Sequence, residues 1–194
     1  MGRPFRRTRA GIRVQLAAGE RAMLARLFDD VDGLLADDAA EREGGGPVRA
    51  GAAADDVLAA LEAQLSPPPP SDPAVARLLP EGNRDDPELA AGYRRLSEHG
   101  LRDRKRAGLG LAATALARRE PVVLDADEAL ALLKALTDVR LVLAERLGVR
   151  TDADAEALHA ALDQAADLAD PRTAAAALYD ALTWWQESLV SALY

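Results

Sequence analysis

The sequence predicts a mainly α-helical protein, an irregular α-helical bundle that carries a short N-terminal β-hairpin. The composition is rich in alanine and leucine, with only 4% aromatic residues, and such side chains favour helix. Apolar residues recur at spacings of three and four, the period of one helix face. Three Asp-Pro pairs, at 72–73, 86–87 and 170–171, are typical helix starts, because aspartate caps a helix and proline fits its first turn.

The hairpin is predicted within residues 1–16. Ile12, Val14 and Leu16 alternate with polar residues, which is the pattern of a half-buried strand. Residues 5–8 are the expected partner strand. An isolated hairpin is marginally stable in water, so we expect it to pack on the helices.

The segments after the hairpin are predicted from composition. Residues 19–36 form the first helix, with one apolar face. Residues 38–54 are a low-complexity run of acids, glycines and alanines, and we expect a flexible loop there. A short helix is expected over 55–65. Residues 66–71 enclose four prolines, which favour a stiff extended spacer over an SH3-type ligand.

Residues 86–194 are predicted to form the helical core of a single domain spanning 1–194. The first core helix begins at Asp86, and Gly100 is expected to break it. The long helix begins at Asp125, has a capping box with Glu128 and ends at Gly148. We expect the following apolar side chains on inner faces of these two helices: Leu89, Tyr93, Leu96, Leu101, Leu130, Leu133, Leu136, Val139, Leu143 and Leu147.

The residue inventory restricts the function classes. Cysteine is absent, which excludes disulfides, thiolate nucleophiles and Cys-ligated metals. His99 and His159 have no second ligand one helical turn away, and no nucleotide-binding or hydrolase motif occurs. No apolar run has the length of a membrane span, and no signal peptide is evident. We therefore expect a cytoplasmic protein that is not an enzyme and uses no cofactor or metal.

Charge is distributed unevenly along the chain. The net charge is -8, yet residues 1–16 carry five arginines and no acid. Residues 94–106 carry six basic residues against two acids. These arginines either grip an acidic protein surface or nucleic acid, or they neutralise the acidic body of the same chain. The candidate partner-binding residues are Arg94, Arg95, Arg102, Arg104, Lys105, Arg106 and Trp184.

The two tryptophans are adjacent, so they differ by about 100° around a helix and cannot be equally buried. Trp185 continues the leucine stripe and is expected in the core. Trp184 is expected to be partly exposed. It serves either as an interface anchor or as a second packing surface.

Several stretches together resemble one family. They are "DPAVARLLPEGNRDDPELAAGYRRLSEHGLRDRK" at 72–105, "DVRLVLAERLGV" at 138–149 and "LYDALTWWQESLVSAL" at 178–193. The hairpin sequence at 5–16 fits as well. By the order and spacing of these motifs, the chain resembles the actinobacterial DUF2017 family, a domain of unknown function also called AosR-like oxidative-stress regulators.

The resemblance implies a cytoplasmic regulator whose genes lie near the Clp adaptor ClpS and a JAMM-type metalloprotease. Some members are described as redox-responsive transcriptional regulators that act through a sigma factor and sense with cysteines. This chain has no cysteine, so thiol sensing cannot operate in it. The family offers no catalytic residues to carry over.

We therefore expect a non-catalytic regulatory or adaptor protein that acts through protein–protein contacts. The setting implied by the resemblance is a transcriptional stress response or Clp-linked proteolysis, with a sigma factor or a Clp-system component as partner. The alternatives are a nucleic-acid-binding transcriptional regulator and an enzyme of unrecognised type. A homodimer paired through the hairpin edge is a further alternative.

Overall fold

The computed structural model describes residues 4–43, 69–80, 82, 86–163 and 170–194. Its helices are α1 (Ala18–Glu43), α3 (Pro73–Leu78), α4 (Pro87–Leu116), α5 (Ala126–Leu147), α6 (Asp152–Asp163) and α7 (Pro171–Leu193). Its strands are β1 (Phe5–Thr8), β2 (Gly11–Val14) and β3 (Val123–Leu124). The mainly α class with an N-terminal hairpin is confirmed. The helix expected over 55–65 lies outside the described residues, as do residues 66–68 of the proline stretch.

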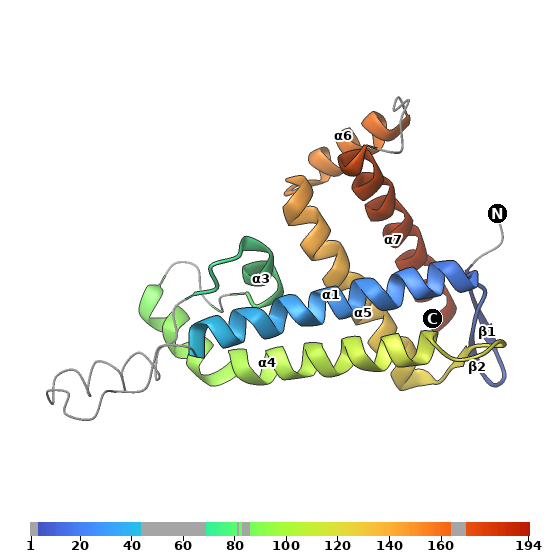
Figure 1. The fold of residues 1–194 in the computed structure, drawn as a ribbon, viewed down its shortest axis with the longest axis horizontal. Helices are drawn as coiled ribbons and strands as arrows, with labels where there is room; N and C mark the ends of the chain where they lie inside the picture. The colour runs from blue at the N-terminus through green and yellow to red at the C-terminus, as the bar shows by residue number, and fades with distance from the viewer. Residues whose placement is uncertain (1–3, 44–68, 81, 83–85, 164–169) are drawn as a thin grey trace, which may run out of the picture.

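The helices form two crossed antiparallel pairs. Helices α1 and α4 run side by side in opposite directions along the long axis of the molecule (Figure 1). Helix α5 crosses them and rises away from them, and α7 returns antiparallel to α5 (Figure 1). Helix α6 joins the far ends of α5 and α7, and α3 packs against α5.

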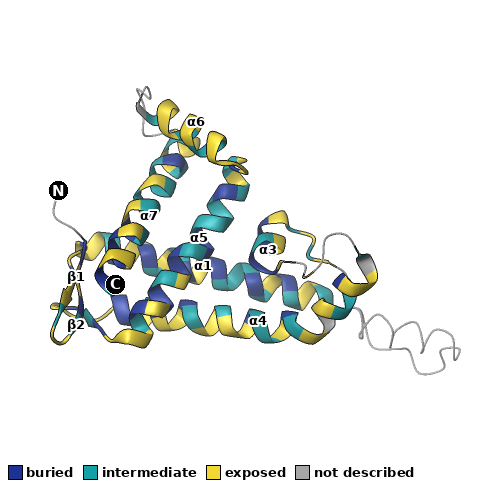
Figure 2. Cartoon of the chain, turned by 180° about the vertical axis from the view of Figure 1, so that it is seen from behind, coloured by how far each residue is buried: buried dark blue, intermediate teal, exposed yellow. Residues whose placement is uncertain are grey.

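The core lies where the two pairs cross. Buried residues line the inner faces of α1, α4, α5 and α7 in this region (Figure 2). Trp185 is 3% exposed, as predicted. The helices contribute these fully or almost fully buried side chains: Leu24, Phe28, Leu35, Leu109, Leu116, Leu132, Leu136, Leu182 and Leu189.

The sheet has three strands in the order β1-β2-β3, all antiparallel. Phe5 lies opposite Val14, and Ile12 lies opposite Leu124. These four side chains are buried and join the helical core, as expected for a hairpin that packs on helices. The prediction missed β3, which has two residues and too short a pattern to recognise.

Neighbouring elements contact both outer edges of the sheet. On the β1 side, the Phe5 amide donates to Ser188 Oγ of α7 at 3.4 Å. On the β3 side, Arg118 Nη2 donates to the Val123 carbonyl at 3.1 Å. Arg7 Nη1 also reaches the Leu193 carbonyl at the end of α7, at 3.0 Å. An edge backbone group that is already bonded is not available to pair with another strand.

The predicted helix boundaries are confirmed at the capped ends. Asp72, Asp86 and Asp170 each accept hydrogen bonds from amides of the first turn that follows. Asp125 forms the expected capping box at the start of α5. Gly148 ends α5 with φ +77°, a conformation that glycine adopts without steric cost.

Two boundary predictions are wrong. Helix α1 continues through residues 38–43, which were expected in the flexible loop; residues 44–54 lie outside the described residues. Asp38 and Arg42 pair with α4, and these tertiary contacts hold the extra turns helical. Helix α4 is unbroken at Gly100, because its packing on α1 outweighs the weak propensity of glycine.

Four leucine and tyrosine side chains predicted on inner faces are exposed instead. On α4, Leu89, Tyr93 and Leu96 are 60%, 48% and 85% exposed. They precede Glu98, the α4 residue that contacts the last turn of α1, so within the described chain this end of α4 extends past α1. On α5, Leu130 is 41% exposed, because the core-facing side begins at Ala129 and Leu132.

Candidate partner-binding surfaces

Most of the basic run of α4 that the structure describes is used inside the chain. Three ion pairs connect α1 to α4, and we call them the ion-pair ladder: Arg106 with Asp32, Arg102 with Asp38, and Arg42 with Glu98. Arg106 Nε lies 2.7 Å from Asp32 Oδ1 at the more exposed end. The other two rungs are buried or nearly so.

Arg102 is the centre of the ladder and is only 6% exposed. Its Nη1 donates to the Leu35 carbonyl at 2.6 Å. Its Nη2 donates to Asp38 Oδ2 at 2.7 Å and to Glu98 Oε1 at 2.9 Å. A buried guanidinium with three acceptors cannot serve as an exposed contact, which corrects the expectation for Arg102.

Arg42 completes a neutral group of two arginines and two carboxylates. It donates to both oxygens of Glu98 and to Asp38 Oδ2. Burial acts to lower the pKa of Arg42, but the hydrogen bonds to Glu98 and Asp38 outweigh it, so this pKa is raised. Because the charges balance, the group tolerates burial that a lone charge would not.

Lys105 connects α4 to α5. Its Nζ lies 2.5 Å from Asp138 Oδ1. Burial raises the pKa of Asp138, although the Lys105 ammonium acts to lower it. Of the other predicted α4 residues, Arg104 is exposed and has no partner among the described residues. The side chains of Arg94 and Arg95 lie outside the part of the chain that is described.

The hairpin presents a different arrangement, which we call the arginine face: Arg6, Arg9 and Arg13. All three side chains are exposed, and none has an ion-pair partner in the described chain. Arg6 lies directly opposite Arg13 across the two strands. The Cβ atoms of directly opposed residues are about 5 Å apart, and like charges on such a pair are destabilising.

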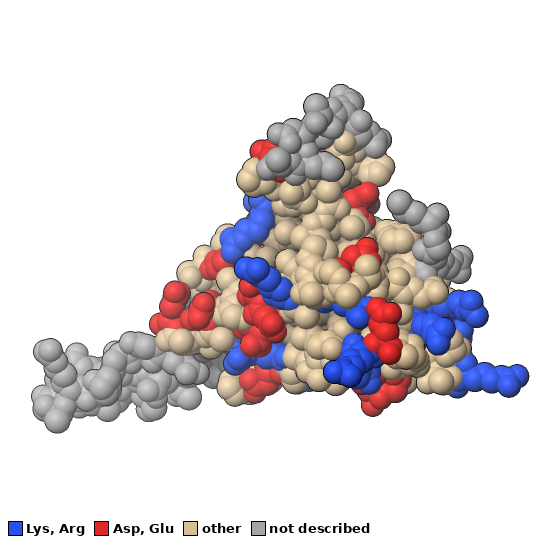
Figure 3. Space-filling view, turned by 45° about the vertical axis from the view of Figure 1, so that its right-hand side comes forward, with Lys and Arg blue, Asp and Glu red and all other residues tan. Residues whose placement is uncertain are grey.

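The space-filling view places this face in its setting. Basic side chains gather at the sheet end of the molecule, whereas acidic and basic side chains are intermixed over the helices in the same view (Figure 3). The signal was present in the five arginines without an acid in residues 1–16, but our predicted site residues did not include these arginines.

Trp184 is 41% exposed, as expected. It precedes Ser188 by one helical turn of α7, and Ser188 accepts a hydrogen bond from the Phe5 amide at the start of β1. The exposed indole therefore lies one turn along α7 from the residue that contacts β1.

The histidines and carboxylates form no metal centre within the described residues. His99 lies 3.3 Å from Asp103 and His159 lies 3.3 Å from Asp180, and all four side chains are exposed. In the described part of the chain, no helix is both long and apolar enough to cross a membrane.

Comparison with known proteins identifies the family. The chain matches the family model described as Domain of unknown function (DUF2017) over residues 2–193. The chain therefore belongs to the DUF2017 family. It matches no curated protein and no solved structure.

Proposed function

We propose that this member of the DUF2017 family is a non-catalytic regulatory or adaptor protein that binds an acidic surface of a protein partner through its arginine face. The observation that carries the proposal is the opposed pair Arg6 and Arg13, exposed and without a carboxylate partner in the described chain. Retaining two like charges side by side costs stability. A partner carboxylate would relieve that repulsion, because guanidinium groups pair with carboxylates in a bidentate geometry.

A protein partner fits this face better than nucleic acid. The protein has a net charge of -8, so most of its surface repels a polyanion. The arginine face has three cations on one short hairpin, whereas proteins that bind DNA tightly contact about 6–10 phosphates. A nucleic-acid-binding regulator is the second hypothesis, and a mobility-shift experiment tests it.

This sheet is better suited to binding a partner through its exposed side chains than through its backbone edges. One backbone group on the outer edge of β1 and one on that of β3 already bond to Ser188 and Arg118, which disfavours strand addition and a homodimer paired at the hairpin edge. We propose that the partner lies across the arginine face and that Trp184 contributes an apolar anchor beside it. By the family resemblance, the partner is a sigma factor or a component of the Clp system.

Charge reversal tests this proposal. A photo-crosslinking residue at Ala10, at the exposed tip of the hairpin, is introduced into the wild type, the Arg6→Glu/Arg13→Glu variant and the Arg26→Glu/Arg172→Glu variant. Both double substitutions change the net charge equally, and Arg26 and Arg172 are exposed on α1 and α7. We expect crosslinked partner to fall at least tenfold only in the hairpin variant, and to fall with added salt.

Equal yields of crosslinked partner from the two double variants would contradict binding through the arginine face. A mobility shift with duplex and single-stranded oligonucleotides at low salt separates the alternatives. A shift with a steep salt dependence that the hairpin variant loses would favour the nucleic-acid hypothesis.

A further inference from the structure

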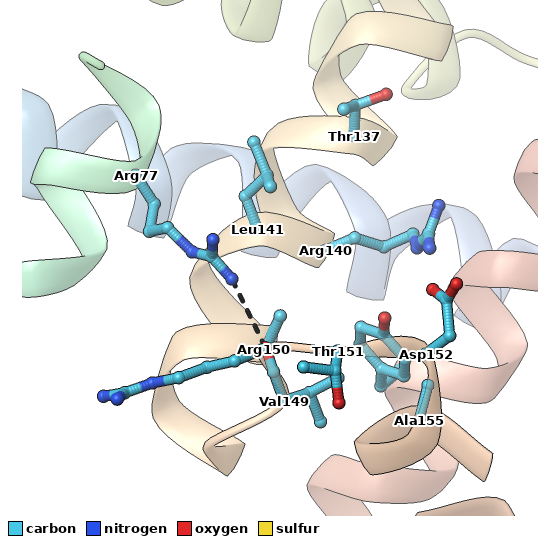
Figure 4. Close-up of a pocket in the computed structure, with 11 residues that line it drawn as sticks. Arg77, Thr137, Arg140, Leu141, Val149, Arg150, Thr151, Asp152 and Ala155 are labelled. Atoms are coloured by element: carbon cyan, nitrogen blue, oxygen red, sulfur yellow. Dashed lines mark hydrogen bonds between the residues drawn. The ribbon is translucent and has the colours of Figure 1, made fainter. Parts of the chain in front are cut away.

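A pocket opens on the side of the molecule away from the arginine face residues. Residues of α3, α5, α6 and α7, together with the loop between α5 and α6, line it (Figure 4). Its volume is about 210 Å³. Its polar lining includes Arg77, Thr137, Arg140, Asp152 and Tyr179.

Arg140 is fixed at the wall of this pocket by uncharged groups. Its Nη1 donates to Gln186 Oε1, and its guanidinium carbon lies 5.5 Å from the centre of the Tyr179 ring. Gln186 is oriented in turn by Thr137, whose Oγ1 accepts from Gln186 Nε2 at 3.0 Å. The guanidinium is therefore preorganised before any ligand arrives.

Arg140 has no direct ion pair in the described chain. Within the described chain, no carboxylate lies at ion-pair distance from it, and its Nε is buried without a hydrogen-bond acceptor. A buried donor without an acceptor is costly, and more so on a cation. An anion in the pocket would supply the charge that Arg140 lacks in an ion pair.

Arg77 adds a second donor from α3. Its Nη2 donates to the Val149 carbonyl at 3.3 Å (Figure 4). Its Nε lies 3.3 Å from Glu145 Oε2, but this Nε is also buried without a satisfactory hydrogen bond. Arg77 is thus partly neutralised, and Arg140 is the stronger anchor.

We propose that this pocket binds a small oxyanion, a carboxylate or a phosphate, with Arg140 as the anchor and Arg77 lining the pocket on the α3 side. Its volume of about 210 Å³ is smaller than the ~300–1,000 Å³ typical of drug-sized ligands, which favours a small ligand. The site uses none of the arginine face residues, so this inference stands independently of the proposed function.

Asp152 provides a test of the ligand class. It comes from the first turn of α6, and its carboxylate lies on the Arg140 side of the pocket in Figure 4, yet the two form no ion pair. This carboxylate repels a simple anion. Replacing it with asparagine should therefore tighten the binding of phosphate or a carboxylate.

Binding is measured by isothermal titration calorimetry and thermal unfolding on the full chain. Phosphate, acetate and succinate are compared as sodium salts with sodium chloride at equal ionic strength. We expect saturable binding of at least one of the three oxyanions and a raised Tm. Arg140→Gln should weaken that binding at least tenfold, Asp152→Asn should strengthen it two- to tenfold, and Lys134→Gln, which removes an exposed cation of α5, should leave it unchanged.

The proposal is wrong if none of the three anions binds above the chloride control, or if Arg140→Gln binds like the wild type. Weaker binding in Asp152→Asn would overturn the simple-anion class. Should Arg140→Gln fail to fold, amide chemical shifts of the wild type decide the matter. Perturbations must centre on residues 137–155 and 179, and perturbations at the hairpin instead would refute the assignment.

Discussion

The two basic segments of this chain differ in whether their charges are paired within the fold. Arg102 and Lys105 of α4 are held by carboxylates from α1, α4 itself and α5. Arg6 and Arg13 of the hairpin face solvent and each other. The difference arises because α4 packs between two acid-bearing helices, whereas the outer face of the sheet packs on nothing that is described.

This contrast shows that a cluster of arginines in a sequence can have two different roles. The number of arginines does not tell a cluster that is paired within the fold from one that forms a binding surface. The separation depends on whether the fold brings carboxylates to them, and the carboxylates from α1 and α5 lie 33–74 residues away from their α4 partners. The following three predictions test the contrast, from the largest expected effect to the smallest.

The first prediction concerns Arg102. Arg102→Ala leaves Asp38 and Glu98 buried with Arg42 as their remaining partner, so we expect the free energy of unfolding to fall by about 3–5 kcal/mol. Urea unfolding followed by circular dichroism measures this value.

Arg104→Ala is the matched control, because Arg104 is exposed two residues further along the same helix. Its effect should remain within about 0.5 kcal/mol. Similar values for the two variants would mean that the ion-pair ladder contributes nothing to stability.

The second prediction concerns the pH dependence of stability. Burial raises the pKa of Asp138 in the folded chain. The folded state therefore keeps this proton at pH values where the unfolded chain has released it. The stabilisation from protonating Asp138 is complete below its unfolded pKa and is lost as pH rises through its folded pKa.

Asp138→Asn removes this dependence. As pH falls from 7 towards 4, we expect the wild type to gain stability relative to Asp138→Asn, measured as the difference in unfolding free energy at each pH. Asp37→Asn, which changes an exposed carboxylate of α1, is the control and should track the wild type. A wild type that loses stability relative to Asp138→Asn on acidification would contradict the assigned direction.

The third prediction reverses one charge of the opposed pair. Arg6→Glu places a carboxylate opposite Arg13, so we expect stability to rise by about 0.2–1 kcal/mol. Thermal unfolding measures the gain, and Arg26→Glu on α1 is the control. Partner crosslinking should fall in the same Arg6→Glu variant, which would separate stability from binding at one residue. A loss of stability would show that the pair is not under repulsion.

Local patterns predicted the fold wherever the cause of structure is local. Caps at Asp86, Asp125 and Asp170 act on amides two or three residues away, so the sequence alone reveals them. The alternation of Ile12 and Val14 likewise predicted the hairpin. Strand β3 has two residues, and its place in the sheet is set by pairing with residues more than one hundred positions earlier.

Long-range contacts explain the other errors. Residues 38–43 have the composition of a loop, but ion pairs with α4 keep them helical. Arg102 belongs to a run of basic residues of the kind usually found on a surface, but the same ion pairs hold it in a buried position. The pocket around Arg140 gathers residues from four helices and one loop, so no single continuous motif could indicate it.

The ion-pair ladder also determines the alignment of α1 along α4. In the antiparallel pairing, Arg42 meets Glu98 and Asp38 meets Arg102. Sliding α1 by one turn in one direction would bring Asp38 to Glu98, and sliding it the other way would bring Arg42 to Arg102. Either shift buries like charges together, which costs several kcal/mol. The leucines between the two helices would accept several alignments, and the alternating signs of the ladder permit only one of them.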